Sequence, residues 1–394
     1  MTVYLDHAAT TPLRPEARDA WLEAAQRVGN ASSIHGPGQQ ARRVLEEARE
    51  RLAATLDCEP IEVVLTSGGT EAVNLAVKGL WWGRAADADT VVLPDGEHHA
   101  TLDAVAWLAE HGAHVRAVGL DDAGRIDAEA FASSLPGAAL ATALVANNEV
   151  GTVNDAGALA AAATDASVPL HLDAVAAFGH VPVSFRDWRG GARGRSGLVA
   201  LSVSAHKIGG PAGVGALVVA REAELSALLH GGGQQRRLRA GTQDVAGAAA
   251  FAVAAELAAA ERETEAARLA ALRQRLVHGI LVAIPDAELL GDPIERVPGN
   301  AHMLFPGAWG ETLLFLLDRE GAAVSTGSAC QAGVPEPSHV VLAMGRTDAE
   351  ARQVLRFTLG RTTDEADVDA VLVVLPGVVE RARAASGART GAGS

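Results

Sequence analysis

The chain has 394 residues, of which 48% are hydrophobic and 21% are charged, a composition typical of a folded protein with a sizeable core and not of a disordered chain. Its 33 basic and 48 acidic residues give a net charge of −15. This balance argues against nucleic acid as the main partner, because phosphate contacts need clustered positive charge. With two cysteines, Cys58 and Cys330, the sequence has no disulfide framework, so we expect a reducing, cytoplasmic setting.

From the sequence we expect neither an export signal nor a membrane span. Asp6 interrupts the N-terminal segment where a signal peptide would need an apolar run. The most apolar stretch, residues 245–255, ends at Glu256, far short of the ~20 residues that a membrane span requires. We therefore expect no membrane association.

Short apolar, β-branched runs alternate with helical patterns along the first half of the chain. This alternation is typical of a mostly parallel sheet covered by helices on both faces. The last two expected strands are joined by about nine residues, too few for a parallel crossover, so that pair is expected to be antiparallel or irregular. The expected strands are 61–66, 90–94, 114–120, 140–146, 169–173, 198–204 and 214–220, and expected helices include 38–55, 100–111 and 155–165.

A long helix rich in Ala, Glu and Arg is expected over residues 244–276, leading away from the sheet. The sequence thus predicts an α/β fold with two domains. The large domain, residues 13–255, carries the roughly seven-stranded sheet, and a smaller α+β domain combines residues 1–12 with 256–385. The Gly/Ala/Ser-rich residues 386–394 are expected to form a disordered tail.

Candidate binding residues follow three of the expected strands, where ligands bind in open α/β sheets. The first group is Ser67-Gly68-Gly69-Thr70-Glu71, between a strand and a helix. Two glycines let the backbone approach an anion, and a helix N-terminus offers free N–H groups. Thr70 could add a hydroxyl. Taken alone, the segment is more commonly an ordinary strand-to-helix turn with Thr70 as the helix N-cap.

The second and third candidates are Asp173 and Lys207. Asp173 ends the strand 169–173, where it could pair with a cationic ring nitrogen or simply cap a helix. Lys207 closely follows the strand 198–204 and precedes a Gly-Gly-Pro turn. Such a lysine can form a Schiff base when it is partly desolvated; otherwise it is a surface lysine in a loop. A phosphate cradle, a carboxylate and a Schiff-base lysine together fit pyridoxal 5'-phosphate (PLP).

With these motifs the chain resembles the cysteine desulfurases of the NifS/IscS type, within the class V aminotransferase family of fold-type I PLP enzymes. The resemblance implies conversion of L-cysteine to L-alanine, with the sulfur left as a persulfide on Cys330. It also implies a homodimer and a sulfur-acceptor protein, either an iron–sulfur scaffold or a thiolation relay. The matching segments are residues 4–12, 29–35, 66–74, 97–99, 147–151, 204–211, 230–242, 325–330 and 355–361.

The resemblance also assigns roles to individual residues. Lys207 matches the lysine that binds PLP covalently, His98 matches the histidine that stacks on the ring and transfers protons, and Asp173 matches the partner of the ring nitrogen. The other residues of the expected cofactor site are Gly69, Thr70, Ser204 and His206 on the phosphate side, Asn148 near the ring hydroxyl, and Thr242, reaching across from the second subunit.

Two further roles concern the substrate. Cys330 lies in a segment of small residues, a context that suits a nucleophilic thiolate, whereas Cys58 is expected to be structural. Arg356 and Thr358 should lie on the opposite face of a strand from Leu355. The resemblance assigns Arg356 to the substrate carboxylate, which an arginine can bind bidentately, with Asn30 as a second contact. A structural salt bridge is the alternative for Arg356.

One position departs from the family pattern, which usually reads Asp-Ala-x-Gln where this chain has Asp173-Ala174-Val175-Ala176. Ala176 can donate no hydrogen bond from its side chain, so contacts to the cofactor hydroxyl must come from Asn148, from water or from a shifted ring. This departure motivates one rival function, a weakly active interaction platform. The other rival is a selenocysteine lyase or cysteine-sulfinate enzyme on the same scaffold.

Two other patterns are weaker. Arg236, Arg237 and Arg239 lie in a Gly-rich loop of an acidic chain without interleaved aromatics, so a role at the active site or subunit interface is favoured over nucleic acid. The adjacent His98 and His99 point in different directions and lack a second ligand pair, so no metal site is expected.

Overall fold

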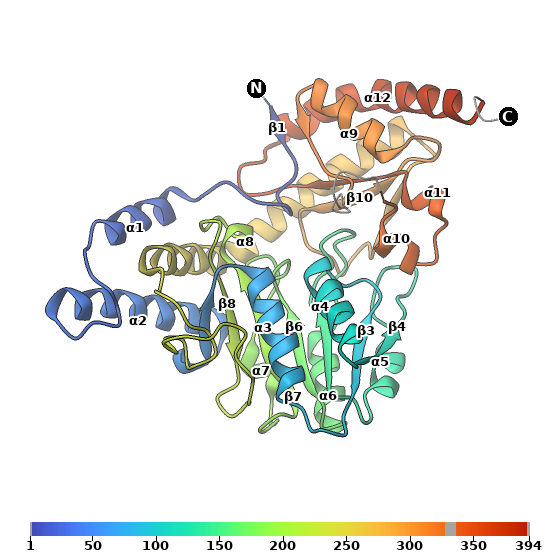
Figure 1. Ribbon diagram of the computed structural model, residues 1–394. Helices are drawn as coiled ribbons and strands as arrows, with labels where there is room; N and C mark the ends of the chain where they lie inside the picture. The colour runs from blue at the N-terminus through green and yellow to red at the C-terminus, as the bar shows by residue number, and fades with distance from the viewer. Residues whose placement is uncertain (1, 328–335, 392–394) are drawn as a thin grey trace.

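The computed structural model describes residues 2–327 and 336–391 of the chain. Figure 1 shows a larger body built on a sheet and, above it, a smaller body that contains both the N-terminal strand and the C-terminal helix. Each body has its own hydrophobic cluster, one from Ala17 to Ala258 and one formed by Leu5 with residues 269–382. A third, smaller cluster packs Val150 of the larger body against residues 290–354 of the smaller one. The division into residues 13–255 and residues 1–12 with 256–385 therefore stays a prediction.

The larger body contains, within the described residues, a seven-stranded sheet in the order β2-β8-β7-β6-β5-β3-β4. β8 is antiparallel to both of its neighbours, and the other pairs are parallel, which confirms the expected sheet and its antiparallel last pair. The strands are β2 (Val63–Thr66), β3 (Thr90–Pro94), β4 (His114–Val118), β5 (Leu140–Leu144), β6 (Pro169–Asp173), β7 (Gly197–Ser204) and β8 (Gly215–Val219).

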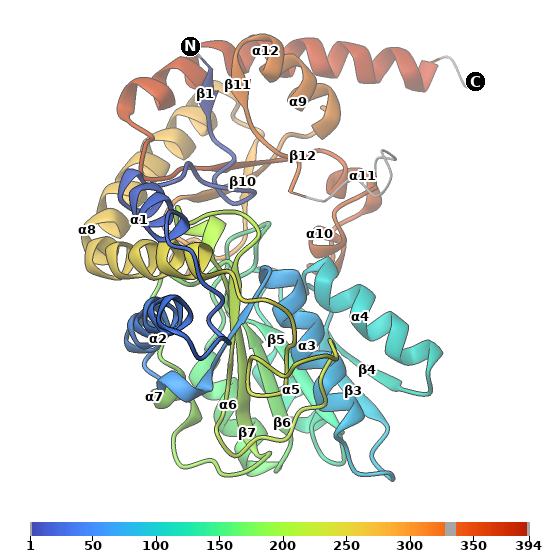
Figure 2. The ribbon, with the colours of Figure 1, turned by 60° about the vertical axis from the view of Figure 1, so that its left-hand side comes forward.

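Helices cover both faces of this sheet (Figure 2), and β5 to β8 are therefore buried along their whole length. Such strands consist of continuous apolar runs, which is why the sequence located them. The helices of this body are α1 (Pro15–Ala25), α2 (Gly36–Leu56), α3 (Gly69–Trp82), α4 (His99–Glu110), α5 (Ala128–Ser134), α6 (Ala156–Asp165) and α7 (Phe185–Arg189), with the short 3-10 helices η1 (Pro60–Glu62) and η2 (Ala205–Lys207).

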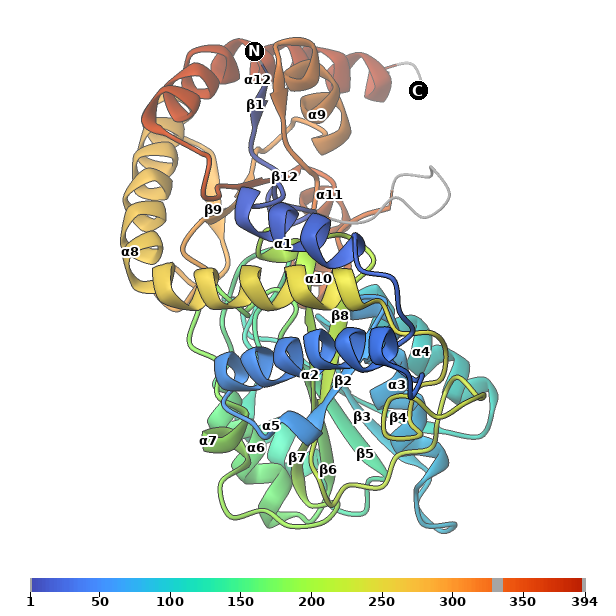
Figure 3. The ribbon, with the colours of Figure 1, turned by 90° about the vertical axis from the view of Figure 1, so that its left-hand side faces the viewer.

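The long helix α8 (Val245–Ala283) connects the two bodies. In Figure 3 its first half lies beside α1 and α2, and its second half rises to the smaller body. There β10 (Asn300–Leu304) pairs antiparallel with β9 (Glu288–Leu290) and with β12 (Val354–Thr358). The remaining elements are β1 (Val3–Tyr4), which pairs with β11 (Ala322–Ala323), and α9 (Gly310–Arg319), α10 (His339–Ala343), α11 (Asp348–Ala351) and α12 (Glu365–Gly391).

The last helix is longer than the sequence indicated. α12 extends to Gly391, so residues 386–391 are helical where a disordered tail was expected. Extending an existing helix adds one hydrogen bond for each residue fixed, and the Ser386 hydroxyl donates to the carbonyl of Ala382 (2.9 Å). Among the described residues, no helix is both long and apolar enough to cross a membrane.

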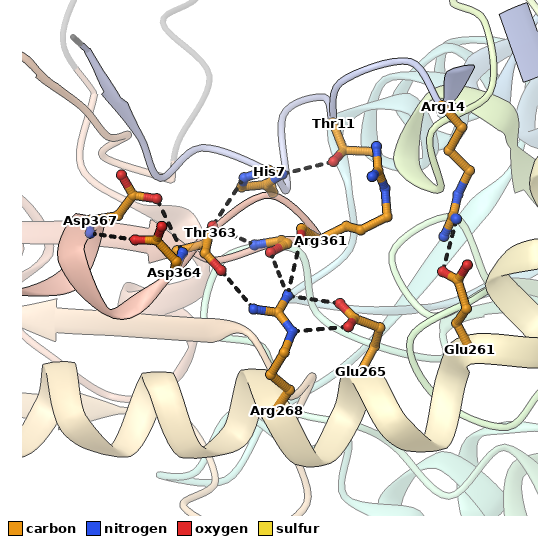
Figure 4. A network of polar contacts seen from close by, with 11 residues as sticks. His7, Thr11, Arg14, Glu261, Glu265, Arg268, Arg361, Thr363, Asp364 and Asp367 are labelled. Carbon is orange, nitrogen blue, oxygen red and sulfur yellow. Dashed lines mark hydrogen bonds and ion pairs between the residues drawn. The ribbon is translucent and has the colours of Figure 1, made fainter. Parts of the chain in front are cut away.

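A polar network joins α8 to the turn after β12 (Figure 4). The Arg268 guanidinium pairs with Glu265 (2.8 Å) and donates to the carbonyls of Thr363 (2.6 Å), Gly360 (3.1 Å) and Arg361 (3.2 Å). One side chain on α8 thus holds the C-terminal turn in place.

We expect Arg268→Ala to destabilise the protein by about 1–3 kcal/mol, because three carbonyls lose a charged donor, and to lower the midpoint of thermal unfolding. Arg275→Ala is the matched control on the same helix: its exposed ion pair with Asp369 (2.8 Å) should contribute little. Equal losses from the two variants would contradict this role of the network.

Candidate active site

A cavity of about 380 Å³ lies where several loops follow the strands of the large sheet. Its wall contains both Ala8 and Ala9 from the N-terminal segment and Arg356 from β12, so the smaller body closes one side of it. Most of the residues predicted from the sequence line this cavity: Gly69, Thr70, His98, Asn148, Asp173, Ser204, His206, Lys207 and Arg356.

Two of the predicted residues do not line the cavity wall. Asn30 is exposed, with its side-chain oxygen accepting from the Ser32 amide (2.9 Å). Thr242 is also exposed, and the role predicted for it concerns a second subunit. Cys330 lies outside the described residues.

The start of α3 leaves room for an anion. Gly68 has a φ of +148° and is the N-cap, so the alternative reading of Thr70 as N-cap is wrong; Thr70 lies in the first helical turn. A Cβ at Gly69 would come within 2.8 Å of Val175 Cγ2, so any larger residue there would force the Val175 side chain to shift. The buried Ser204 hydroxyl has no hydrogen-bond partner among the described residues and lines the same cavity, as a phosphate ligand would.

Asp173 ends β6 with its side chain in the cavity wall. No helix follows it, so the helix-cap reading is wrong. One carboxylate oxygen, Oδ1, accepts from the Val175 amide (2.9 Å) and the Ser202 hydroxyl (3.1 Å). Burial raises the pKa of Asp173 to about 6, while these hydrogen bonds and Lys207 oppose the rise. Near neutral pH this buried carboxylate is therefore mostly ionised, which suits pairing with a cationic ring nitrogen.

Lys207 ends η2 and is not a surface lysine. Its Nζ donates to the carbonyls of Ala8 (2.5 Å) and Ala9 (2.9 Å). Desolvation and the Arg356 charge lower the pKa of Lys207 to about 8, although Asp6 and Asp173 act in the opposite direction. A lysine with such a pKa is partly neutral, and so nucleophilic, at neutral pH.

This lowered pKa predicts how fast Lys207 captures PLP. Only the neutral amine reacts, so the rate should rise with pH and level off above about 8, whereas an ordinary lysine with a pKa of about 10.4 would need a more alkaline solution. Arg356→Gln removes a charge that lowers the pKa of Lys207, so its profile should shift to higher pH. Stopped-flow absorbance of the PLP-free protein measures both profiles; coincident profiles near the ordinary lysine value would contradict the prediction.

His98 is the N-cap of α4, and its Nδ1 accepts from the Ala100 amide (3.1 Å). The ring is open to the cavity, yet its recessed position and the nearby Lys207 lower its pKa to about 4. His98 is therefore neutral at pH 7. With Nδ1 acting as an acceptor, Nε2 carries the proton, so His98 can take part in proton transfer.

Arg356 forms a salt bridge, which was the alternative role considered for it, and it also lines the cavity. Its Nη2 pairs with Asp6 (2.9 Å) and its Nη1 donates to the Asn148 carbonyl (2.7 Å). Its Nε is buried and has no hydrogen-bond partner among the described residues. On the opposite face of β12, Leu355 and Phe357 are buried in the second cluster, as the alternation of the strand predicts.

Two contributions to the site were missed from the sequence. Asp6 holds Arg356, and its position inside the matched segment 4–12 was the available signal. Glu97 is buried, with Oε1 accepting from the Leu144 amide (2.7 Å) and Oε2 without a partner among the described residues. Burial raises the pKa of Glu97 to about 8, and the sequence gives no indication of this burial.

The model of the family "Aminotransferase class-V" matches residues 3–371. The chain is 49% identical to "IscS-like cysteine desulfurase" of Mycobacterium tuberculosis, over 99% of both chains. It is 37% identical to "Cysteine desulfurase IscS" of Dictyoglomus turgidum, over 98% of this chain and 96% of the relative.

Solved structures with the same fold include "NIFS-LIKE PROTEIN" (TM-score 0.89, 30% identity, 97% of this chain and 100% of that chain). Another is "SspA in complex with cysteine" (TM-score 0.78, 28% identity, 91% of this chain and 99% of that chain). The α/β fold expected from the sequence is confirmed, and so is the resemblance. The chain belongs to the class-V aminotransferase family, in its group of NifS/IscS-like cysteine desulfurases.

Proposed function

We propose that this protein is a PLP-dependent cysteine desulfurase, which converts L-cysteine to L-alanine and leaves the sulfur as a persulfide on Cys330. The observation that carries the proposal is one cavity that combines a lysine of lowered pKa, a buried carboxylate and an unpartnered serine hydroxyl. Relatives that match nearly the whole chain are named cysteine desulfurases, and a solved relative is described in complex with cysteine.

The residues of the cavity fit PLP. The cradle at Gly69 would hold the phosphate, with Thr70, Ser204 and His206 as side-chain ligands. Asp173 would pair with the ring nitrogen and Lys207 with the aldehyde carbon. Asn148 would contact the ring hydroxyl, and His98 would lie over the ring. When bound, PLP withdraws electrons from the Cα of the substrate and so stabilises negative charge there.

The residues of the chain supply binding and proton transfer. Arg356 binds the substrate carboxylate, with Asn30 as the proposed second contact. Lys207, partly neutral at pH 7, removes the Cα proton. The Cys330 thiolate attacks the substrate sulfur, so that an S–S bond forms and the Cβ–S bond breaks. The electron pair of that bond stays with the carbon fragment, which His98 or Lys207 protonates to give alanine.

Product analysis tests the proposal. The purified protein, yellow from bound PLP, should release one alanine for each cysteine consumed, and added reductant should free the sulfur as sulfide. Parallel assays with selenocysteine and cysteine sulfinate compare the rival substrates. Faster alanine release from either of them would replace the desulfurase assignment, and a colourless protein without turnover would favour the interaction platform.

We also propose a cytoplasmic homodimer that passes sulfur to an acceptor protein such as an iron–sulfur scaffold. Three apolar side chains of the N-terminal region are exposed in the single chain, Trp21 by 41%, Val28 by 89% and Ile34 by 91%. Exposed apolar residues close in sequence support burial against a second subunit. Thr242 is available to contact the partner's cofactor. Light scattering tests the dimer, and co-purification in mild salt identifies the acceptor.

Ala176 offers a direct test of the departure from the family pattern. It lines the main cavity and also a neighbouring void of about 40 Å³ beside Asn148 and His180. We expect Ala176→Gln to fill this void and donate to the ring oxygen of PLP, a bond of about 1.5–3 kcal/mol to a charged group, and so to slow the loss of PLP during dialysis. Faster loss would mean that glutamine overpacks the site, and an unchanged rate and absorbance titration would contradict the predicted contact.

A further inference from the structure

Behind Asp173, three buried side chains form a continuous chain of hydrogen bonds that the mechanism above does not use. Thr142 Oγ1 lies 2.9 Å from His171 Nδ1, His171 Nε2 lies 3.1 Å from Ser202 Oγ, and Ser202 Oγ lies 3.1 Å from Asp173 Oδ1. Thr142, His171 and Ser202 are fully buried, and Asp173 is 2% exposed.

The register of the sheet builds this chain. Thr142 on β5 lies directly opposite His171 on β6, and Asp173 lies opposite Ser202 on β7. His171 and Asp173 are two residues apart on one strand and so share a face of the sheet. The four side chains therefore meet on one face of the sheet, held by three neighbouring central strands, and Asp173 is the member that reaches the cavity.

When Asp173 is ionised, the protons that each group can donate determine the direction of every hydrogen bond between Thr142 and Asp173. An ionised carboxylate can only accept, so Ser202 donates its single proton to Asp173. Ser202 must then accept from His171, whose Nε2 carries the proton, and His171 Nδ1 accepts from Thr142. Burial lowers the pKa of His171 to about 3, so the ring is neutral and has one proton to place. Each donor polarises the next, which strengthens the last bond to the carboxylate.

We propose that His171 is a positioning residue for the cofactor ring: acting through Ser202, it keeps Asp173 ionised and turns its second oxygen, Oδ2, toward the ring nitrogen. No hydrogen bond from the described residues reaches Oδ2. This role rests on the proposed PLP-dependent function. The other groups that act on Asp173 are the Val175 amide and Lys207, which favour the ionised form, and Glu97, whose negative charge would oppose it.

The first test measures the ionisation of Asp173 by NMR. The sample is the full chain, freed of PLP and labelled at the aspartate carboxyl carbon, and Asp173→Asn identifies the signal of Asp173. Ser202→Ala should raise the titration midpoint of Asp173 by about one pH unit, because a lost hydrogen bond to the charged form raises a carboxyl pKa. His171→Phe keeps the bond from Ser202 but removes the donor that polarises it, so it should raise the midpoint by a smaller amount. His171→Gln should keep the titration midpoint of Asp173 at the parent value, since the glutamine amide can donate to Ser202 and accept from Thr142. Thr101→Val, which removes a buried hydroxyl without a partner among the described residues, is the matched control and should leave it unchanged.

The second test is the tautomer of His171. Histidine labelled with ¹⁵N in the holoenzyme should show a protonated Nε2 and an unprotonated Nδ1, and Thr142→Val should weaken this preference. With ¹⁵N-labelled PLP, the ring nitrogen of His171→Phe should lose its proton at a lower pH than in the parent protein. If His171→Phe does not fold, Ser202→Ala carries both measurements.

An unchanged Asp173 midpoint in both variants, or a proton on Nδ1 of His171, would overturn the proposal. The carboxyl titration needs neither PLP nor turnover. The titration can therefore contradict the role of His171 while the desulfurase activity is intact, or support that role in a protein that lacks the activity. A failure of this proposal is thus distinguishable from a failure of the proposed function.

Discussion

Lys207→Ala should abolish covalent attachment of PLP and lower turnover by on the order of 10⁴-fold, because one side chain supplies both the amine that binds the aldehyde and the base for the Cα proton. Lys207 is the lysine in the wall of the cavity, and its pKa is lowered to about 8. The sequence contains two lysines, so borohydride reduction followed by peptide mass spectrometry has two possible attachment sites to distinguish.

Lys78→Arg is the control for this variant. Lys78 lies on α3 with its Nζ over the Trp107 ring (4.8 Å), a contact that arginine preserves. This control should keep full PLP content and full activity. If PLP remained attached to Lys207→Ala after reduction, the assignment of Lys207 would be wrong.

Cys330→Ser should still bind cysteine and PLP but should form no persulfide, because serine cannot take up the substrate sulfur. Sulfide release should fall to the background rate. After incubation of the parent protein with cysteine, mass spectrometry should find one additional sulfur atom on the Cys330 peptide. Binding precedes sulfur transfer in the proposed mechanism, so the substrate-induced change in PLP absorbance should survive the substitution.

Cys58→Ser is the matched control, and the structure explains why it should behave almost as the parent protein does. Cys58 is 8% exposed, and burial raises the pKa of its thiol to about 12. A thiol with that pKa provides almost no thiolate at neutral pH. Extra sulfur on the Cys58 peptide, or sulfide release by Cys330→Ser at the parent rate, would refute the role of Cys330.

Much of the fold could be predicted from local sequence patterns. The expected strands 90–94 and 169–173 coincide with β3 and β6, because a strand buried on both faces needs an unbroken apolar run that is visible in the sequence. The antiparallel pairing of β7 with β8 followed from a connection too short for a crossover. The candidate residues Asp173 and Lys207 were found in the same way, since Asp173 ends such a strand and Lys207 lies three residues after the end of another.

The end of α12 and the role of Thr70 were less predictable. A Gly/Ala/Ser-rich segment favours both fraying and helix extension, and packing decides between them. Thr70 and Gly68 both suit a helix N-cap; the choice of Gly68 depends on its positive φ, which a single sequence does not reveal.

The sequence by itself determined the α/β class, the strands and the residue types that suit PLP, because these depend on local apolar periodicity and on motifs of a few residues. Tertiary structure alone decided which of these residues meet and how they ionise. Arg356 pairs with Asp6 across a separation of 350 residues, and Thr142, His171 and Ser202 reach Asp173 through the register of three strands. The pKa values of Lys207, His98 and Asp173 depend on burial and on charges brought close by folding, and both are properties of distance in space, which order along the chain does not contain.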